Sequence, residues 1–284
     1  MKYTYIIIIN LLTTGYLFTQ NIKTDKICDL DQLVLETSGL LFYNEYLWTF
    51  NDSGGEPTIY QVDIKNGKVL KQKTIKKAKN RDWEAICSDG KYAYIGDFGN
   101  NLGIYDIFVI YKIKLSDLNS IKDTISALKI IFEYDPNYYK SKTSNARNFD
   151  CEAMIVKNDS IFLFTKNWIN DKTYLFKISC NSGKYVAQFV DSLDVGGLIT
   201  DADFNKETNT IILLGYEKGK NKNSFIIKLS DFKQNIFKAK VEKKYLELID
   251  YQTEGIAFKN KSELFISNEA NDMHKQQLRI FKIF

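Results

Sequence analysis

Five oxygen-bearing side chains recur along the chain in similar surroundings, and they are the first candidates for chemistry. Each stands in a short segment where a small residue and an apolar residue follow or nearly follow it. The five residues are Ser38, Glu84, Glu152, Asp201 and Glu254. The intervals between them are 46, 68, 49 and 53 residues. Self-similarity at roughly 40 to 50 residues is typical of a β-propeller.

Side chains of this kind would bind a hard cation if the fold brought them together. Four carboxylates in one narrow channel repel one another, and burial raises their pKa values. No Lys or Arg recurs at a matching position to neutralise them. Calcium accepts six to eight oxygen ligands in irregular geometry, so we expect calcium, held by the five side chains. Zinc and copper are disfavoured because His274 is the only histidine and the cysteines are widely spaced. The alternative is that the acids bond backbone amides, with alternate ones protonated.

The elements that must position these side chains are short strands. Each of the five segments is followed by an apolar run that ends in a polar cluster, and then by a third run rich in β-branched and aromatic residues. The second runs are 46–50, 92–96, 161–165, 211–215 and 264–267. The third runs are 58–63, 107–112, 173–178, 224–229 and 278–284. Fourth strands are expected at 69–75 and 127–134.

The repeat count predicts an all-β fold, a five-bladed β-propeller. Residues 254–284 supply three strands and no fourth, whereas 31–36 reads as one isolated strand near the N-terminus. We therefore expect the N-terminal strand to complete the last blade and close the ring, which removes exposed sheet edges. The long second interval is explained by a polar loop at 135–149.

The first strands of a propeller line its axis, and the second strands run antiparallel beside them, so the polar clusters after the second strands should surround the axial ring. This arrangement predicts a funnel with an acidic floor. The candidate ligand-binding residues are Asn51, Asp52, Asp97, Asn100, Lys166, Asn167, Trp168, Tyr216, Lys218, Asn268 and Glu269. Asp52 and Asp97 are candidate catalytic bases. The alternative for the Asn and Asp residues is ordinary turn chemistry.

Composition supports one exported domain. At 284 residues with 44% hydrophobic residues and two prolines, the chain can bury a large core and shows no linker, so we expect a single domain at 21–284. The formal net charge is +4, but the lysines are scattered and only three arginines occur, which is unlike a nucleic-acid footprint. We expect a monomer whose partner is a small polar or phosphorylated ligand, or a protein, at the funnel.

Residues 1–20 resemble a secretory signal peptide, with a charged start and a short apolar stretch. We expect its removal and a secreted or periplasmic protein with no membrane attachment; an uncleaved membrane anchor is the alternative. The four cysteines are expected as buried free thiols, with a Cys87 to Cys151 bridge as the alternative.

Two resemblances follow from these motifs. Segments 37–40, 152–154 and 251–256 resemble the calcium-activated nucleotidases, or apyrases. That resemblance implies a five-bladed propeller with an axial calcium and Ser38, Glu84, Glu152 and Glu254 as ligands; Asp201 stands where the family has serine. Segments 47–55, 95–101 and 164–168 are more closely similar to uncharacterised secreted β-propellers common in Bacteroidetes, a likeness that implies no activity.

Three functions fit the predicted funnel. A calcium-stabilised module could bind a ligand there without turnover. An apyrase-like phosphohydrolase would use calcium to polarise phosphoryl oxygens, with Lys166 and Lys218 offsetting phosphate charge. A glycoside hydrolase would use two axial carboxylates in separate roles, with Trp168 and Tyr216 as sugar platforms. The first two are favoured, because equivalent carboxylates in a ring suit a shared ion better than separated roles.

Overall fold

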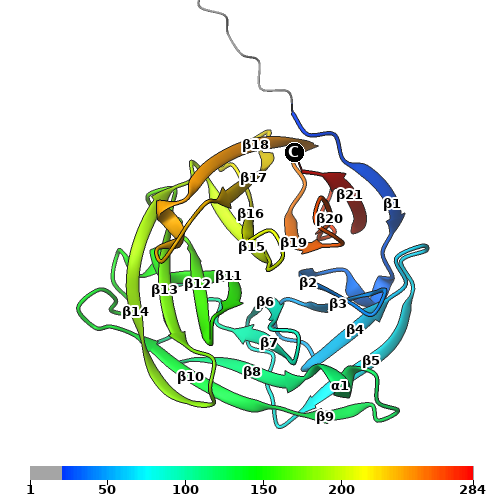
Figure 1. The fold of residues 1–284 in the computed structure, drawn as a ribbon, viewed down its shortest axis with the longest axis horizontal. Coiled ribbons are helices and arrows are strands. Elements are labelled where there is room, and N and C mark those ends of the chain that lie inside the picture. The colour runs from blue at the N-terminus through cyan, green and yellow to red at the C-terminus, as the bar shows by residue number, and fades with distance from the viewer. Residues whose placement is uncertain (1–20, 284) are drawn as a thin grey trace, which may run out of the picture.

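The computed structural model describes residues 21–283, and the predicted signal peptide at 1–20 lies outside the described residues (Figure 1). The chain is all-β, with each repeat beginning on a strand near the middle of the molecule and continuing outward in antiparallel hairpins. The first strands are β2 (Thr37–Tyr43), β6 (Trp83–Ser88), β11 (Asp150–Lys157), β15 (Leu198–Asn205) and β19 (Thr253–Phe258). The second strands are β3 (Tyr46–Asn51), β7 (Tyr92–Asp97), β12 (Ser160–Lys166), β16 (Thr210–Tyr216) and β20 (Glu263–Asn268).

The outer strands follow in the same order. The third strands are β4 (Thr58–Val62), β8 (Phe108–Lys114), β13 (Lys172–Ser179), β17 (Asn223–Ser230) and β21 (Gln277–Lys282). The outermost strands are β5 (Val69–Lys76), β10 (Leu128–Tyr134), β14 (Gly183–Asp194), β18 (Lys240–Ile249) and β1 (Asp25–Asp29), and β9 (Thr124–Ser126) precedes β10. Short helices α1 (Leu115–Leu118), η1 (Gln32–Val34), η2 (Ala146–Phe149) and η3 (Ile236–Lys238) lie in the connections.

The first strands form a closed cycle of neighbours. β2 contacts β6, β6 contacts β11, β11 contacts β15, β15 contacts β19, and β19 contacts β2. Figure 1 shows these strands around the centre of the view, with the later strands of each repeat farther out. The arrangement is propeller-like, and it brings residues that are far apart in sequence to a common axis.

Outer strands link neighbouring repeats around the rim. β10 pairs in parallel with β14, which joins two four-stranded sheets into one sheet of eight strands. β9 pairs in parallel with β5 of the preceding sheet. These parallel pairings occur at sheet edges, where unpaired backbone groups would otherwise be exposed.

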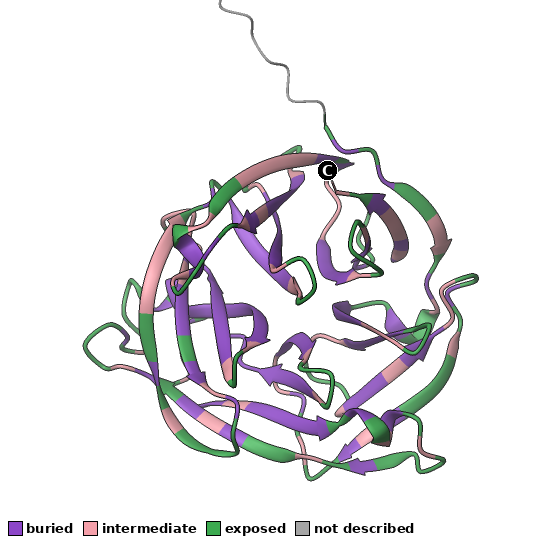
Figure 2. Cartoon of the chain, viewed as in Figure 1, coloured by how far each residue is buried: buried purple, intermediate pink, exposed green. Residues whose placement is uncertain are grey.

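The core is divided among the interfaces between neighbouring sheets. Five buried clusters lie there, and each takes residues from two neighbouring repeats. For example, Phe50 of β3 packs edge-on against Trp83 of β6 at 5.5 Å between ring centroids. Figure 2 shows the inner strands buried and the outer loops exposed. The inner strands are apolar on both faces because both faces are covered, so they read as continuous apolar runs, for example in β12 and β16.

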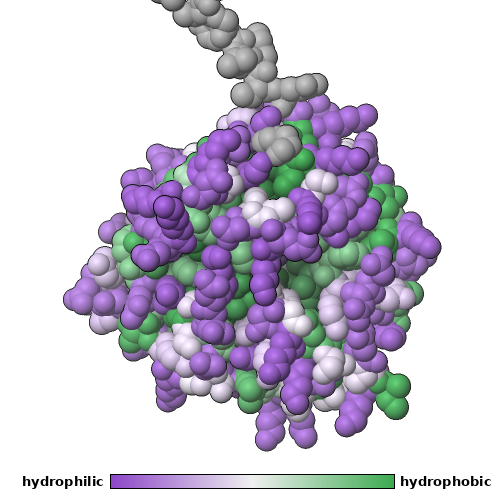
Figure 3. Space-filling model, in the orientation of Figure 1, coloured by the Kyte–Doolittle hydropathy of each residue, from purple (hydrophilic) through white to green (hydrophobic). Residues whose placement is uncertain are grey.

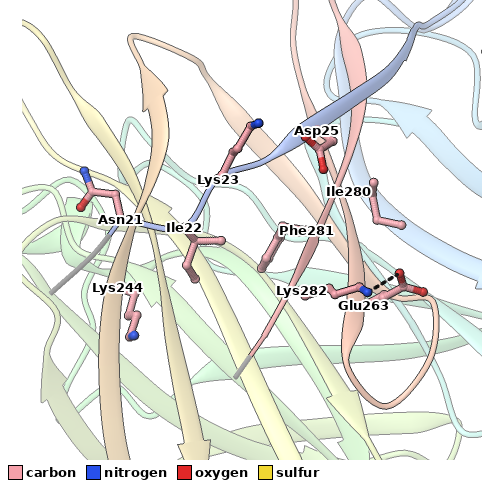
Figure 4. Close-up of a pocket in the computed structure, with 9 residues that line it drawn as sticks. All are labelled: Asn21, Ile22, Lys23, Asp25, Lys244, Glu263, Ile280, Phe281 and Lys282. Carbon is pink, nitrogen blue, oxygen red and sulfur yellow. Dashed lines mark ion pairs between the residues drawn. The ribbon is translucent and has the colours of Figure 1, made fainter.

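The N-terminal strand is not where the sequence suggested. Residues 31–36 were expected as a strand, but Gln32–Val34 form η1, because the Asp31 side chain accepts a hydrogen bond from Leu33 N at 3.2 Å and begins a helical turn. The strand is β1, which pairs antiparallel with β21 at the outer edge of the C-terminal sheet. Figure 4 shows the preceding residues Asn21 to Lys23 crossing from β18 toward this sheet, beside the ion pair of Lys282 with Glu263.

Within residues 21–283, no helix has the length and apolar character needed to cross a membrane. The four cysteines are free thiols in the described chain; Cys87, Cys151 and Cys180 are buried, and Cys28 is half-buried. Figure 3 shows one face of the molecule, hollowed near its centre and surrounded by hydrophilic side chains.

Candidate metal centre

A β-bulge recurs near the same point of every first strand, and it places the axial side chains. Glu84 is skipped between Trp83 and Ala85 in the pairing of β6 with β7. Glu152 and Glu254 are skipped in the same way in β11 and β19. A bulge leaves one residue outside the ladder and turns its side chain away from the alternation of the strand. The bulges therefore change the direction of all three glutamate side chains in the same way, and all three side chains are buried.

Glu84 shares its position with two aspartates. Carboxylate oxygens of Asp52, Asp82 and Glu84 lie within 4.8 Å of one another. Asp52 follows β3, whereas Asp82 immediately precedes β6, so two neighbouring repeats contribute to this carboxylate trio. Calcium binds oxygen at 2.3–2.6 Å, and oxygens that share one ion stand about 5 Å apart or less. The spacing of the trio fits one such ion.

Gly99 forms the wall beside the trio. A Cβ built on Gly99 would stand 2.3 Å from Glu84 Oε1 and 2.4 Å from Asp82 Oδ2. Gly99 N donates to Asp82 O at 3.2 Å, which fixes the backbone at this distance. Only glycine allows the chain to approach these carboxylates so closely.

Burial and mutual repulsion raise the pKa values of the trio. Burial raises the pKa of Asp52 to about 7, and the charges of Asp82 and Glu254 add to the effect. Burial and the charge of Asp150 raise the pKa of Asp82 to about 6, against the opposing charge of Arg81. The pKa of Glu84 is raised well above its ordinary value by burial and then by Glu152. The trio therefore favours either protons or a cation.

Further carboxylates surround the trio. Glu254 Oε1 accepts a hydrogen bond from the Tyr216 hydroxyl at 3.3 Å, and burial raises the Glu254 pKa. Glu269 accepts from Gln252 Nε2, and burial, with the charges of Glu254 and Asp52, raises the Glu269 pKa to about 9. The carboxylates that influence one another at this mouth are Asp52, Asp82, Glu84, Asp150, Glu152, Glu254 and Glu269.

Lys166 is buried inside this group of acids, not exposed at its rim. Its Nζ lies 3.1 Å from Glu152 Oε2, and both side chains are at most 7% exposed. Burial lowers the Lys166 pKa, but the carboxylates of Glu152 and Glu254 outweigh it and raise this pKa well above the ordinary value. The ammonium therefore stays charged and neutralises the Glu152 side of the mouth. The Asp52, Asp82 and Glu84 side remains the side suited to a cation.

Asp150 joins the trio to the loop after β12. Asp150 Oδ1 accepts from Asn100 N, and Asp150 Oδ2 accepts from Trp168 Nε1 at 2.7 Å. Trp168 is half-buried, and the Arg147 guanidinium lies 5.3 Å from its ring. Lys218 donates to Trp168 O and pairs with Asp171, which holds the loop from the next repeat.

The fourth repeat departs from the expected ring. In β15 the residue skipped in the pairing with β16 is Thr200, so Thr200 and not Asp201 occupies the position equivalent to Glu84. The fully buried Asp201 carboxylate instead accepts from Ala202 N at 2.8 Å and from Ile256 N at 2.7 Å. Asp201 thus joins β15 to β19, as the amide-bonding alternative predicts. Thr200 Oγ1 donates to Thr253 O at 2.7 Å.

Ser38 lies beside its bulge, which in β2 falls between Ser38 and Leu41. Its Oγ donates to Glu84 O at 3.2 Å, so the hydroxyl contacts the backbone of the trio's glutamate. The side chain is buried.

Turn chemistry accounts for much of the predicted funnel. Asn51 Nδ2 donates to Leu33 O, and Asn100 Oδ1 accepts from Ile104 N and Tyr105 N. Asn167 bonds Thr165 and Asn170 through its side chain. Asn268 Nδ2 donates to Glu269 O and Lys275 O. These amides bond their own turns or, for Asn51, the neighbouring connection at η1.

Asp97, a candidate base, is also occupied by the backbone. Its Oδ1 accepts from Arg81 N at 3.1 Å and from Asp82 N at 3.0 Å, and it is 4% exposed. Asp97 therefore positions Asp82. Asp52 differs from Asp97, because its buried Oδ1 has no hydrogen-bond partner among the described residues.

Sequence reasoning missed Asp82, Asp150 and Gly99 as site residues. A signal was present, because Asp-x-Glu occurs both at Asp82 to Glu84 and at Asp150 to Glu152. In the first pair both acids belong to the trio; in the second, Asp150 bonds the Trp168 loop and Glu152 pairs with Lys166.

The residues present fit a hard cation. The donors are carboxylate oxygens, and one of them, Asp52 Oδ1, is buried without a hydrogen bond in the described chain, as is Oε2 of the neighbouring Glu254. Buried oxygens of this kind cost free energy unless something positive meets them. Calcium would be held by Asp52, Asp82 and Glu84, and it would supply a Lewis acid at the mouth.

No family model matches the chain, and no curated protein matches it. Among solved structures, the chain is similar to an exo-β-1,3-galactanase from Phanerochaete chrysosporium with galactose, at a TM-score of 0.56 and 8% identity, over 93% of this chain and 65% of that chain. It is also similar to MPT-4, a mannose phosphorylase from Leishmania mexicana, at a TM-score of 0.51 and 8% identity, over 91% and 88% of the two chains.

The chain thus spans slightly less than two thirds of the galactanase. At such low identity, the likeness concerns the fold alone, and it supports a β-propeller-like architecture. The resemblances to apyrases and to the Bacteroidetes propellers stay predictions.

Proposed function

We propose that this chain is an exported, calcium-binding, five-bladed β-propeller that presents the ion to a polar or phosphorylated ligand at one mouth of its axis. The observation that carries the proposal is the carboxylate trio of Asp52, Asp82 and Glu84 with its glycine wall. Three acids from two neighbouring repeats converge there, whereas the nearby Glu152 already has a cation in Lys166.

The five-bladed reading is supported by the cyclic contacts of the five first strands. In this reading the eight-stranded sheet is two blades joined by β10 and β14, and β1 completes the last blade. Residues 21–284 then form one domain, and removal of residues 1–20 delivers it, as a monomer, to the periplasm or the exterior. Lysines scattered over the surface offer no nucleic-acid footprint.

Ligand binding is favoured over turnover. A hydrolase needs a base free to take a proton from water, and of the two candidates Asp97 is bonded to amides and Asp52 would bind the ion. The ion would therefore bind a phosphoryl or hydroxyl oxygen of the ligand. Apyrase-like phosphohydrolysis is the catalytic form of the same proposal, with calcium polarising the phosphoryl oxygens.

A glycoside hydrolase is the second candidate. Asp52 and Glu269, with pKa values raised to about 7 and about 9, would supply one ionisable and one protonated carboxyl near neutral pH in the absence of an ion. This reading requires activity without calcium, which separates it from the first.

The test is thermal unfolding of the mature protein in EGTA and in calcium, for the wild type and Glu84→Gln. We expect calcium to raise the Tm of the wild type and to leave that of Glu84→Gln unchanged. The matched control is Glu207→Gln, because Glu207 is exposed and pairs with Lys261 away from the mouth. A wild-type Tm that ignores both calcium and EGTA would overturn the proposal.

Activity assays then distinguish a phosphohydrolase, a glycoside hydrolase and a binding module without turnover. Calcium-dependent phosphate release from nucleotides and phosphoesters would establish the phosphohydrolase. Release of reducing sugar in EGTA would establish the glycoside hydrolase and contradict a calcium role. A calcium-dependent Tm with neither activity supports the binding module.

A further inference from the structure

A cavity lies beside the loop that carries Trp168, since Ile169 and Asn170 line it. Its volume is about 490 Å³, within the range of small-molecule sites. The lining residues are Tyr138, Asn145, Asn148, Phe149, Ile169, Asn170, Tyr174 and Phe189. None of these eight described residues carries a charge. The cavity therefore differs in chemistry from the acidic mouth and suits a neutral ligand.

The aromatic rings form a curved wall. Phe149 and Tyr174 meet at 64° with centroids 5.5 Å apart, and Tyr174 and Phe189 meet at 79° with centroids 6.1 Å apart. Tyr138 stacks on Phe189 at 5.2 Å, so these two rings already cover each other. The C–H groups on one face of a sugar ring can pack against an aromatic wall of this shape.

Two of the side chains that line this cavity have unused hydrogen-bond donors. Asn148 is only 5% exposed; its Oδ1 accepts from Ile169 N at 2.9 Å, but its Nδ2 has no bond to the described residues. Tyr174 accepts from Asn170 Nδ2 at 2.8 Å, which leaves its own hydroxyl proton to donate. Asn145 is exposed at the edge. Each of these donors is available to bond a ligand oxygen.

Apolar side chains in the cavity are exposed. Tyr138 is 55% exposed and Ile169 is 52% exposed, although both lie against a formed core. The cavity is also held in place from both sides: Trp168 N donates to Arg147 O at 3.3 Å, and Gly103 of the neighbouring loop accepts from Lys142 N. The wall is thus built before a ligand arrives, which lowers the entropy cost of binding.

We propose that this cavity binds one ring of a neutral saccharide, with the ring face on the aromatic wall and its hydroxyls on Asn148 Nδ2 and the Tyr174 hydroxyl. The inference does not rest on calcium binding, because no trio residue lines the cavity. Trp168 immediately precedes Ile169, which lines the cavity, and its indole donates to Asp150. A saccharide bound here would therefore change the surroundings of the Trp168 indole.

The test is titration of the mature protein in EGTA with maltotetraose, cellotetraose, laminaritetraose and mannotetraose, followed by tryptophan fluorescence and calorimetry. We expect at least one tetrasaccharide to bind at millimolar concentration or below and to shift the emission. Tyr138→Ala should weaken that binding roughly tenfold or more, because it removes an exposed part of the wall. Asn148→Asp keeps the acceptor for Ile169 N, removes the donors, and should weaken binding similarly.

The matched control is Tyr46→Ala, since Tyr46 is also an exposed tyrosine, at the start of β3. It should bind as the wild type does. Failure of all four sugars to bind at about 10 mM would overturn the proposal. Sugar binding that is unchanged in Tyr138→Ala and Asn148→Asp would also overturn it. The same holds if adenosine binds instead of the sugars and the two variants weaken that binding. Because EGTA is present throughout, these outcomes do not depend on the calcium site.

Discussion

The backbone at Gly99 touches the carboxylate of Glu84: a Cβ on Gly99 would lie 2.3 Å from Glu84 Oε1. Atoms at this distance overlap, so any larger residue must displace the carboxylate or the chain. The segment after β7 is thus adapted to the acid that the β6 bulge projects. The two strands, paired with each other, build one side of the carboxylate trio together.

Gly99→Ala should therefore damage the calcium site directly. The added methyl group would displace Glu84 and Asp82, so we expect at least roughly tenfold weaker calcium affinity together with a lower Tm. Calorimetric titration and thermal unfolding measure both effects. The control is Gly55→Ala, since a Cβ at Gly55 meets nothing within 4 Å. Full calcium affinity in Gly99→Ala would show that the trio is not the site.

The pH dependence of stability should have a definite sign in EGTA. Folded Asp52 and Asp82 have pKa values raised to about 7 and about 6, against about 4 in the unfolded chain. Between pH 4 and 7, approximately, the folded protein keeps protons that the unfolded chain releases, so its stability falls as pH rises. Asp52→Asn should flatten this slope. Stability that rises over this pH range in the wild type, with no flattening in the variant, would contradict the raised values.

Calcium should then matter most at high pH. The ion replaces the protons that the trio has lost, so the increase in Tm on adding calcium should be larger near pH 8 than near pH 5. Scanning unfolding at matched calcium and several pH values measures this difference.

Removal of Lys166 should be strongly destabilising. Lys166→Met leaves Glu152 and Glu254 buried without their cation, a loss of about 3–5 kcal/mol for a broken buried pair. Denaturant unfolding measures it. The double variant Lys166→Met with Glu152→Gln should recover much of the loss, because the uncompensated charge is gone. Losses that simply add in the double variant would show that the two groups do not act as a pair.

Asp201 should contribute to stability and not to calcium binding. Asp201→Asn retains one acceptor oxygen in place of two, so one of the bonds from Ala202 N and Ile256 N is lost. We expect a loss of about 1–3 kcal/mol of unfolding free energy with unchanged calcium affinity. A large fall in calcium affinity would return Asp201 to the ligand set.

Much of the fold could be predicted from the sequence. The second and third strands lie close to their expected ranges because apolar runs between Asn, Asp and Gly turns determine them locally. The N-terminal strand was misplaced because Asp31 caps a helical turn, a local bond that outweighs the strand-like composition of 31–36. The parallel pairing of β10 with β14 is a long-range contact that no local pattern indicates.

The site was predictable in part. Glu84, Glu152 and Glu254 were expected at one mouth, and each stands at a bulge, where side chains shift by one residue. In β15 the residue at the bulge is therefore Thr200, where the sequence suggested Asp201. Asp82 is positioned by long-range contacts, since Asp97 Oδ1 accepts from Asp82 N, and Lys166 reaches Glu152 across the pairing of β11 with β12.

A single calcium ion among Asp52, Asp82 and Glu84 is the central prediction, and diffraction from crystals grown in calcium would reveal it. Anomalous difference density should show a single peak within about 2.3–2.6 Å of carboxylate oxygens of all three residues, and it should vanish in Glu84→Gln crystals. A map without a peak there, or with the ion bound elsewhere and the trio protonated, would contradict the account.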